Sequence, residues 1–466
     1  LDFINYYRNF GNVGFVHSCN KGASLARGKF LVFLNNDTIV LPGWLDELVE
    51  TFVNFPKAGL VGSKLLYPDG SLQEAGCIIW NDGSAWNYGR CDDPNKPEYN
   101  YARQVDYCSG ASIMIPRDLF DEAGQFDTIY APAYAEDADL AFKVREAGRQ
   151  VWYQPLSALV HFEGVSCGTN LNHGVKSYQV ENQKKLLKRW LTDISKLGEP
   201  GHDVEFLRNR FVSQRLLILD SLTPTPDQDV GSVTIFEFIR CFVEMGHKVT
   251  FVPVDNLGYC YGYTKALQRI GVECRYHPYD SDVVKILESL AEPADFVLLY
   301  RVYSGGRYLE TVKSLMPNSR IIFDTVDLHY LREERQAEIS DSDKTRLKAR
   351  ETKSRELEII SRVDCTIVLS EHEKVLIGKE LPQASIAVIP LVINVDGSGP
   401  GFNSRKGILF IGGFNHKPNQ DAVHYFIDSI WPIISHELTE IQFNIIGSNI
   451  PDDIRRRRSE RINVVG

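Results

Sequence analysis

Short apolar runs alternate along the chain with segments whose apolar residues recur every three or four positions, a rhythm that predicts an α/β protein. In the first block, residues 1–205, the runs at 14–16, 30–34, 60–62, 112–115 and 151–154 predict strands. The periodic segments 44–54 and 178–190 predict amphipathic helices. Long loops rich in Gly, Asp, Asn and Pro separate these elements.

From residue 215 onward the rhythm is more regular. The runs 216–220, 248–254, 296–300, 320–323, 365–369 and 386–389 predict strands separated by helices, the order of a doubly wound parallel sheet. A polar stretch at 394–406 predicts a linker, and the run at 407–413 opens a third α/β block. We therefore expect three domains, over residues 1–205, 213–393 and 404–466.

The apolar run that begins at Lys29 ends abruptly in Asn35-Asn36-Asp37. A buried parallel strand places such residues at the carboxyl edge of its sheet, where α/β folds bind ligands. On an extended backbone Asn35 and Asp37 point the same way, and carboxylates combine with substrate phosphates around Mg²⁺. The alternative is a strand-end turn in which Asn and Asp bond their own backbone.

Just upstream, residues 20–28 are predicted to form a loop, a short helix and a glycine stop. A helix N-terminus at Asn20 and Gly22 would approach a phosphate or a sugar. The alternative is ordinary helix capping.

Two further candidates lie downstream. Glu136 and Asp137 open a predicted helix that ends at Gly148, after an aromatic loop that includes Tyr134. A carboxylate at a pocket mouth can take the proton of an acceptor hydroxyl, whereas acidic residues in a first turn also serve only as partners of the helix dipole. His161 follows another apolar run, and imidazole is both a common ligand of Mn²⁺-like ions and a common structural side chain.

Composition changes this picture little. Of the 466 residues, 43% are hydrophobic and 24% charged, as in soluble globular proteins. A net charge of −10 without a basic stripe argues against a nucleic-acid-binding protein. Nine scattered cysteines are typical of reduced thiols, and no run approaches the roughly 18 apolar residues of a membrane span. The cytoplasm is the expected compartment.

Several short motifs occur together in the first block. They are Asn20-x-Gly22-x-x-x-Ala26-x-Gly28, Leu34-Asn-Asn-Asp37, Pro42-Gly-Trp44, residues 62–70, Ser109-Gly-Ala111, Phe126-Asp127, Glu136-Asp-Ala-Asp-Leu140 and Val160-His161. As an ensemble they resemble the family-2 glycosyltransferases of the GT-A fold, the nucleotide-diphospho-sugar transferases, especially the bacterial rhamnosyltransferase-like and O-antigen or exopolysaccharide enzymes.

This resemblance implies roles for individual residues. Asp37 would belong to the metal motif that holds the nucleotide diphosphate, with the Asn35 amide replacing a usual carboxylate, and His161 would complete the shell of Mn²⁺ or Mg²⁺. Asp137 would be the catalytic base. The donor side would take Asn20, Gly22, Asn35, Asn36 and Asp37, and the acceptor side Glu136, Asp139 and Tyr134. The family's opening strand would lie before Leu1.

The motifs Leu219-Asp220, residues 224–232, residues 323–329 and residues 409–419 resemble a family-4 glycosyltransferase of the GT-B fold, with Rossmann-like domains. That resemblance implies that Gly231 lies in an acceptor-side loop and that Gly412 and Gly413 approach donor phosphates. For Gly412 and Gly413 a plain strand-to-helix turn is the alternative. The family's donor-binding glutamates would lie beyond Gly466.

Together the resemblances imply a two-module glycosyltransferase of cell-surface polysaccharide assembly. Its first module would transfer a sugar, with inversion, from a nucleotide-sugar to a saccharide or lipid-linked saccharide, in the cytoplasm or at the inner face of the membrane. The second module would add another sugar. Two alternatives stay open: a metal-dependent sugar nucleotidyltransferase, and a non-catalytic glycosyltransferase-like scaffold. The sequence does not fix the oligomeric state.

Overall fold

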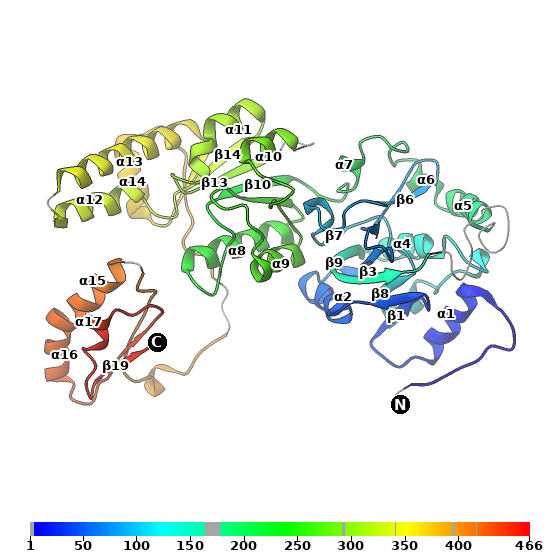
Figure 1. Ribbon diagram of the computed structural model, residues 1–466, viewed down its shortest axis with the longest axis horizontal. Helices are drawn as coiled ribbons and strands as arrows, with labels where there is room; N and C mark the ends of the chain where they lie inside the picture. Colours follow the sequence, from blue (N-terminus) through cyan, green and yellow to red (C-terminus); the bar gives the residue numbers. More distant parts are fainter. Residues whose placement is uncertain (1–3, 164–177, 291–293, 341, 394–396, 416) are drawn as a thin grey trace. The chain divides into compact units, whose positions relative to one another are not determined.

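The computed structural model describes residues 4–163, 178–290, 294–340, 342–393, 397–415 and 417–466 (Figure 1). The chain forms two compact units. One comprises Leu1–Thr223 and Phe238–Leu391, and the other Pro224–Glu237 and Val392–Gly466. Sheets flanked by helices make up both units, so the expected α/β class is confirmed. The three domain boundaries stay a prediction.

The first sheet has seven strands, ordered β1-β8-β3-β9-β2, with β4 beside β3 and β7 beside β9. The strands are β1 (Phe30–Leu34), β2 (Thr38–Val40), β3 (Ala58–Leu66), β4 (Leu72–Glu74), β7 (Arg103–Gln104), β8 (Ser112–Pro116) and β9 (Gln150–His161), and a separate hairpin holds β5 (Cys77–Ile79) and β6 (Ala85–Asn87). β3 pairs parallel with β9 and antiparallel with β8.

β1 differs from its expected environment. It was expected to be a buried parallel strand, but it pairs antiparallel with β8 and is the last described strand on its side of the sheet. Its side chains alternate, with Leu31 and Phe33 in the core and Val32 and Leu34 exposed. The pleat explains this alternation, because only one face of the strand meets the core.

The strand expected at residues 14–16 is wrong as well. These residues begin the helix α1 (Gly14–Leu25), whose buried positions are Val16 and Ala23. Two positions seven apart lie on one helical face, a period that a window of three residues cannot reveal.

The described part of the first block contains six further helices and two short 3₁₀ turns. They are α2 (Trp44–Asn54), α3 (Arg117–Glu122), α4 (Glu136–Glu146), α5 (Tyr178–Arg189), α6 (Leu191–Ile194) and α7 (Val204–Leu207), with short 3₁₀ turns η1 (Pro97–Tyr99) and η2 (Thr128–Tyr130). The helix expected over residues 44–54 is therefore confirmed.

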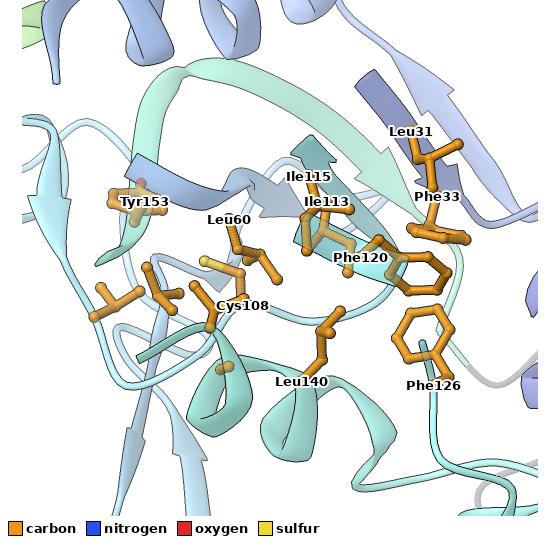
Figure 2. Close-up of a cluster of buried hydrophobic side chains, with 14 of the residues drawn as sticks. Leu31, Phe33, Leu60, Cys108, Ile113, Ile115, Phe120, Phe126, Leu140 and Tyr153 are labelled. Carbon is orange, nitrogen blue, oxygen red and sulfur yellow. The ribbon is translucent and has the colours of Figure 1, made fainter. Parts of the chain in front are cut away.

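An aromatic and aliphatic core fixes α4 against the first sheet (Figure 2). The ring of Phe33 lies 5.1 Å from that of Phe120 and 4.9 Å from that of Phe126. Leu140 of α4 is fully buried in the same cluster. Since α4 carries Asp137 in its first turn, burial of its apolar face also fixes the position of that carboxyl group.

The second sheet is entirely parallel, in the order β12-β11-β10-β13-β14-β15-β16. Its strands are β10 (Arg215–Asp220), β11 (Lys248–Pro253), β12 (Val272–Cys274), β13 (Phe296–Tyr300), β14 (Arg320–Asp324), β15 (Cys365–Val368) and β16 (Ile386–Val388). The helices are α8 (Val230–Glu244), α9 (Tyr261–Arg269), α10 (Val283–Ser289), α11 (Leu309–Leu315), α12 (His329–Ser340), α13 (Asp343–Arg362) and α14 (Glu371–Glu380), with η4 (Gly305–Tyr308). This order confirms the expected doubly wound sheet, whose strand sequence reverses between β10 and β13.

Hydrogen bonds join the first and second sheets within the larger unit. The Ala102 amide donates to the Gln268 carbonyl at 2.9 Å, and the Tyr276 hydroxyl donates to the Asn95 carbonyl at 2.6 Å.

The smaller unit holds a parallel three-stranded sheet, β17-β18-β19. Its elements are η5 (Phe402–Ser404), β17 (Ile408–Ile411), α15 (Lys417–Tyr425), the π-helical turn η6 (Phe426–Ile430), α16 (Trp431–Glu437), β18 (Phe443–Ile446), α17 (Asp452–Arg455) and β19 (Ile462–Val465). Phe414, Val423 and Ile445 lie at the centre of its core.

Candidate active site

Asp37 and His161 lie side by side at one edge of the first sheet. The strand β2 begins directly after Asp37 and pairs antiparallel with β9, with Thr38 opposite His161. The Phe162 amide donates to the Asp37 carbonyl at 2.9 Å. As a result, Nε2 of His161 is 3.4 Å from Oδ1 of Asp37, and the two side chains are only 13% and 11% exposed.

The residues before Asp37 form a turn and not an extended strand. β1 ends at Leu34, and the chain turns at Asn36 and Asp37. The Thr38 hydroxyl donates to the Asn35 carbonyl at 2.7 Å across this turn. The expectation that Asn35 and Asp37 point the same way along an extended backbone is therefore wrong, although both still lie within one short segment.

The second ring nitrogen of His161 lies 3.0 Å from Oε1 of Gln73, on β4. Burial lowers the pKa of His161, an effect that Asp37 and Glu163 only partly oppose. The imidazole is therefore neutral at pH 7, and a proton on Nδ1 donated to Gln73 leaves the Nε2 lone pair facing Asp37. Glu163 accepts hydrogen bonds from Arg90 at 2.8 Å and from the Tyr67 hydroxyl at 3.0 Å.

Asp137 is the second residue of α4, and backbone amides hold both of its oxygens. Gly110 donates to Oδ2 at 3.0 Å and Ala138 donates to Oδ1 at 2.8 Å. Burial raises the pKa of Asp137, and these amides oppose the rise because they favour the ionised form. The backbone carbonyl of Ala111, the next residue after Gly110, accepts a hydrogen bond from the backbone N–H of Asn35 at 3.0 Å. The short segment 109–111 therefore contacts both Asp137 and the turn that carries Asp37.

Glu136 and the loop before it lie beside Asp137. The Glu136 side chain is 5% exposed, and burial together with Asp137 raises its pKa well above the ordinary range. Tyr134 and Ala135 both have positive φ angles, +78° and +71°. Asn182 of α5 is fully buried and donates to the carbonyls of Tyr130, Ala133 and Tyr134 at 2.7, 2.9 and 3.1 Å. Such backbone strain persists only where surrounding contacts impose it.

Two of the expected site residues, Asp139 and Asn20, are engaged elsewhere, and a third, Gly22, is exposed. Asp139 is fully buried between α4 and α5, with Lys143 at 3.0 Å and the Trp190 indole at 2.8 Å. Asn20 lies in the middle of α1, where the expected helix N-terminus is wrong, and its amide group bonds both the N–H and the carbonyl of Phe126. Gly22 is on the exposed face of the same helix.

Gln73 and Glu74 were not predicted from the sequence, and Gly110 was part of a motif that had no role assigned to it. Gln73 and Glu74 belong to β4, a strand of three residues that folds back onto β3. The signal that would have found them is the turn Pro68-Asp69-Gly70, which marks a hairpin after an apolar strand.

A second group of charged residues lies at the carboxyl edge of the second sheet, where its strand order reverses. The Arg301 guanidinium donates to Asp220 at 2.6 Å and to the Ser221 hydroxyl at 2.8 Å. Burial raises the pKa of Asp220 to about 6 and that of Asp324, at the end of β14, to about 7. Arg301 and Val326 both have positive φ angles. Perturbed carboxyl groups at such a switch point are typical of ligand sites in doubly wound sheets.

The predicted glycines of the second module are all at helix or strand ends. Gly231 is the second residue of α8, just before Ser232, whose amide donates to Asp229 at 2.8 Å. Gly412 and Gly413 follow β17, where the Gly412 amide donates to the Ile446 carbonyl and the Gly413 carbonyl accepts from Asn419 at 2.9 Å.

The described ranges contain no group of three or more His, Cys, Asp or Glu side chains placed to hold a metal ion. Every helix in these ranges is too short or too polar to span a bilayer.

Residues 2–123 match the family described as Glycosyl transferase family 2. Over 153 residues, 32% of this chain and 12% of its relative, the sequence is 31% identical to the O-antigen biosynthesis protein RfbC of Myxococcus xanthus. It is 26% identical to an N-acetylglucosaminyl-diphospho-decaprenol L-rhamnosyltransferase of Mycobacterium tuberculosis over 30% of this chain and 48% of that protein. A crystal structure of GalNAc-T7 with UDP, GalNAc and Mn²⁺ aligns with a TM-score of 0.32 and 16% identity, over 40% of this chain and 37% of that one.

The chain spans less than half the length of each curated relative named above. The match to Glycosyl transferase family 2 covers the N-terminal part of the chain, whose relatives include an O-antigen biosynthesis protein and a rhamnosyltransferase.

Proposed function

We propose that the first block transfers a sugar from a nucleotide-sugar to a hydroxyl of a saccharide or lipid-linked saccharide, in the assembly of a bacterial cell-surface polysaccharide. One observation carries the proposal: the Asp37–His161 pair and Asp137 are linked through the segment 109–111. The family-2 match supports sugar transfer, and the names of the relatives support the polysaccharide setting.

The Asp37–His161 pair suits a divalent cation. It offers one carboxylate and one neutral imidazole nitrogen, 3.4 Å apart and largely buried. Two protein donors are enough where diphosphate oxygens and water complete the shell, as is common for Mg²⁺. Mn²⁺ or Mg²⁺ bound there would stabilise the negative charge of the leaving nucleoside diphosphate. Asn35 and Asn36, in the same turn, would contact the donor as neutral hydrogen-bonding groups.

Asp137 is proposed as the base. Its two amide hydrogen bonds favour the carboxylate, which would accept the proton of the acceptor hydroxyl as that oxygen attacks the anomeric carbon. The bond from the anomeric carbon to the diphosphate breaks in the same displacement, and its electron pair leaves with the diphosphate. Attack from the opposite side inverts the anomeric configuration.

The loop before α4 is proposed to receive the acceptor. Tyr134 and Glu136 precede Asp137 in sequence, and the strained backbone at Tyr134 and Ala135 orients this loop. Asp139 and Asn20 are not included, because other side chains or backbone groups already engage them.

The second sheet and the smaller unit are proposed to form a further, GT-B-like sugar-transfer module, with Gly231, Gly412 and Gly413 at its ligand sites. What supports this is the reversal of strand order between β10 and β13 beside Asp220, Arg301 and Asp324.

The test is nucleoside diphosphate release by the full 466-residue chain, with Mn²⁺, a panel of nucleotide-sugars, and oligosaccharide or lipid-linked acceptors. We expect Asp137→Asn to lower kcat by about 100-fold or more, and Asp37→Ala and His161→Ala to abolish the response to Mn²⁺. The matched control is Asp118→Asn, an exposed acid in the first turn of α3.

Three other outcomes would point elsewhere. Pyrophosphate formation that survives Asp137→Asn would favour a nucleotidyltransferase. Release that survives changes at both Asp37 and Asp137 would move the activity to the second module. Release from no donor would favour the scaffold.

A further inference from the structure

Glu74 is a buried carboxyl group in the candidate active site to which the proposed reaction assigns no role. It is the last residue of β4, and its side chain is 1% exposed. Oε1 accepts the Ser109 amide at 3.0 Å. Oε2 is also buried, and the Cys77 thiol is a neighbour of the carboxyl group.

Two successive amides connect Glu74 to Asp137. Ser109 donates to Glu74 at 3.0 Å, and the next amide, Gly110, donates to Asp137 at 3.0 Å. The position of Gly110 therefore depends on the contact that holds Ser109. A buried carboxyl group on β4 thus fixes the segment that binds the proposed base on α4.

Charge limits how this arrangement can work. Asp137 has two buried carboxyl neighbours, Glu74 and Glu136, and neighbouring carboxylates in low dielectric do not all ionise. The other titratable groups that face Glu74 are Cys77, Tyr107, Cys108 and Tyr153, with the Arg90 guanidinium as a nearby cation. Burial raises the pKa of Glu74 to about 7; Asp137 adds to the rise, while the Ser109 amide, Cys77 and Arg90 oppose it.

We infer that Glu74 is a positioning residue for Asp137, and that this role needs its hydrogen-bond-accepting oxygen but no negative charge. It holds the Ser109–Gly110 segment in place without adding a second negative charge beside the base. This inference rests on the proposed role of Asp137 as the base.

Two variants of the full chain separate shape from charge. Glu74→Gln keeps an oxygen that accepts the Ser109 amide and has no charge at any pH. Glu74→Leu removes the acceptor. With Mn²⁺ and whichever nucleotide-sugar the panel identifies, we expect Glu74→Gln to keep kcat at neutral pH, and Glu74→Leu to lower kcat by about 100-fold with little change in donor KM. The wild-type pH profile should also contain a titration near pH 7 that Glu74→Gln lacks.

Thermal unfolding gives a readout that does not depend on turnover. A carboxyl group whose pKa rises on folding stabilises the folded chain fully below the unfolded pKa, and this contribution is lost as the pH rises through about 7. The Tm of Glu74→Gln minus the Tm of wild type should therefore increase as the pH rises to about 7. The control is Glu122→Gln, which changes an exposed acid at the end of α3. Its Tm should differ from that of wild type by the same amount at every pH.

Each result decides a different point. If Glu74→Gln loses as much kcat as Glu74→Leu at every pH, a charged Glu74 is required and the inference fails. If Glu74→Leu keeps wild-type kcat, Glu74 does not position the base. If wild type turns over no donor, the proposed function fails instead. In that case parallel Tm curves for wild type and Glu74→Gln would still contradict a role for an uncharged Glu74.

Discussion

The guanidinium of Arg269 forms two hydrogen bonds to the carboxylate of Glu47, at 2.6 and 2.8 Å, between residues 222 positions apart in sequence. Glu47 lies on α2 beside the first sheet, and Arg269 ends α9 beside the second. Paired donors on a partly buried carboxylate are stronger than ordinary surface ion pairs. We predict that Arg269→Ala lowers the free energy of unfolding by about 1 kcal/mol, which urea denaturation of the full chain would measure.

The control for this prediction is Lys353→Ala, which breaks the more exposed pair with Glu380 inside the second block. Its effect should be smaller. An exchange of charges, Glu47→Arg with Arg269→Glu, should recover part of the loss. Equal effects of Arg269→Ala and Lys353→Ala would mean that the contact between the sheets adds nothing beyond a surface pair.

Gln73 should matter for metal activation and not for proton transfer. Its Oε1 lies 3.0 Å from Nδ1 of His161 and so fixes which ring nitrogen faces Asp37. Loss of such a hydrogen bond to a metal-binding histidine typically lowers the affinity for the metal by about 10- to 100-fold. We predict that Gln73→Leu raises the Mn²⁺ concentration for half-maximal activity by about tenfold, with kcat at saturating Mn²⁺ close to wild type. Gln73→Glu, which still accepts the Nδ1 proton, should restore much of the affinity, and a leucine variant with unchanged Mn²⁺ dependence would contradict the role.

Asn182 should control acceptor binding through the loop that it holds. Its side-chain amide donates to three carbonyls of residues 130–134 from a fully buried position. Asn182→Ala removes the hydrogen bonds that Asn182 donates to those carbonyls, so we predict a loss of about 1–3 kcal/mol of stability, and a rise in acceptor KM larger than any change in donor KM. Lys184→Ala, an exposed neighbour on α5, is the control. Equal changes in both KM values would show that the loop does not serve the acceptor alone.

Lys64 should make stability depend on pH above neutrality. Its ammonium is buried and donates to the Pro94 carbonyl at 3.0 Å and to Asn100. Burial, with a smaller contribution from Arg103, lowers its pKa to about 7. Between that value and the pKa of about 10.4 in the unfolded chain, the unfolded state binds more protons, so stability rises with pH by up to about 1.4 kcal/mol per unit.

Lys64→Met should flatten that rise, while Lys57→Met, at an exposed position, should not. Urea denaturation at several pH values between about 7 and 10 would measure both. A wild-type stability that falls over this range would contradict the direction of the Lys64 shift.

Local pattern was sufficient where an element is decided by its own residues. The strand at 30–34 and the helix at 44–54 follow from apolar runs and helical spacing, and both match the structure. The sequence also placed Asp37, Asp137 and His161 among its candidates, but it could not show that Asp37 contacts His161 or that residues 109–111 link the turn of Asp37 to Asp137. These links depend on the pairing of β2 with β9, on the hydrogen bond that the Gly110 amide donates to Asp137, and on the one that the Ala111 carbonyl accepts from the Asn35 backbone amide.

Partners supplied by distant or very short elements were beyond the reach of the pattern. Gln73 and Glu74 lie on a strand of three residues, too short to show a period. Asn20 is of a residue type that commonly caps helices, but its hydrogen-bond partner, Phe126, is 106 residues away. Such side chains are assigned by tertiary contacts, which no local window contains.

The left-handed backbone at Tyr134 and Ala135 has a consequence for how this protein would change under selection. Non-glycine residues in this conformation cost about 1–3 kcal/mol each, and glycine adopts it freely. A population selected only for survival at high temperature should therefore accumulate glycine at these two positions. If Tyr134 faces the acceptor as proposed, those variants would gain thermal stability and lose acceptor specificity. The residues at positions 134 and 135 would then show whether selection had acted on stability or on specificity.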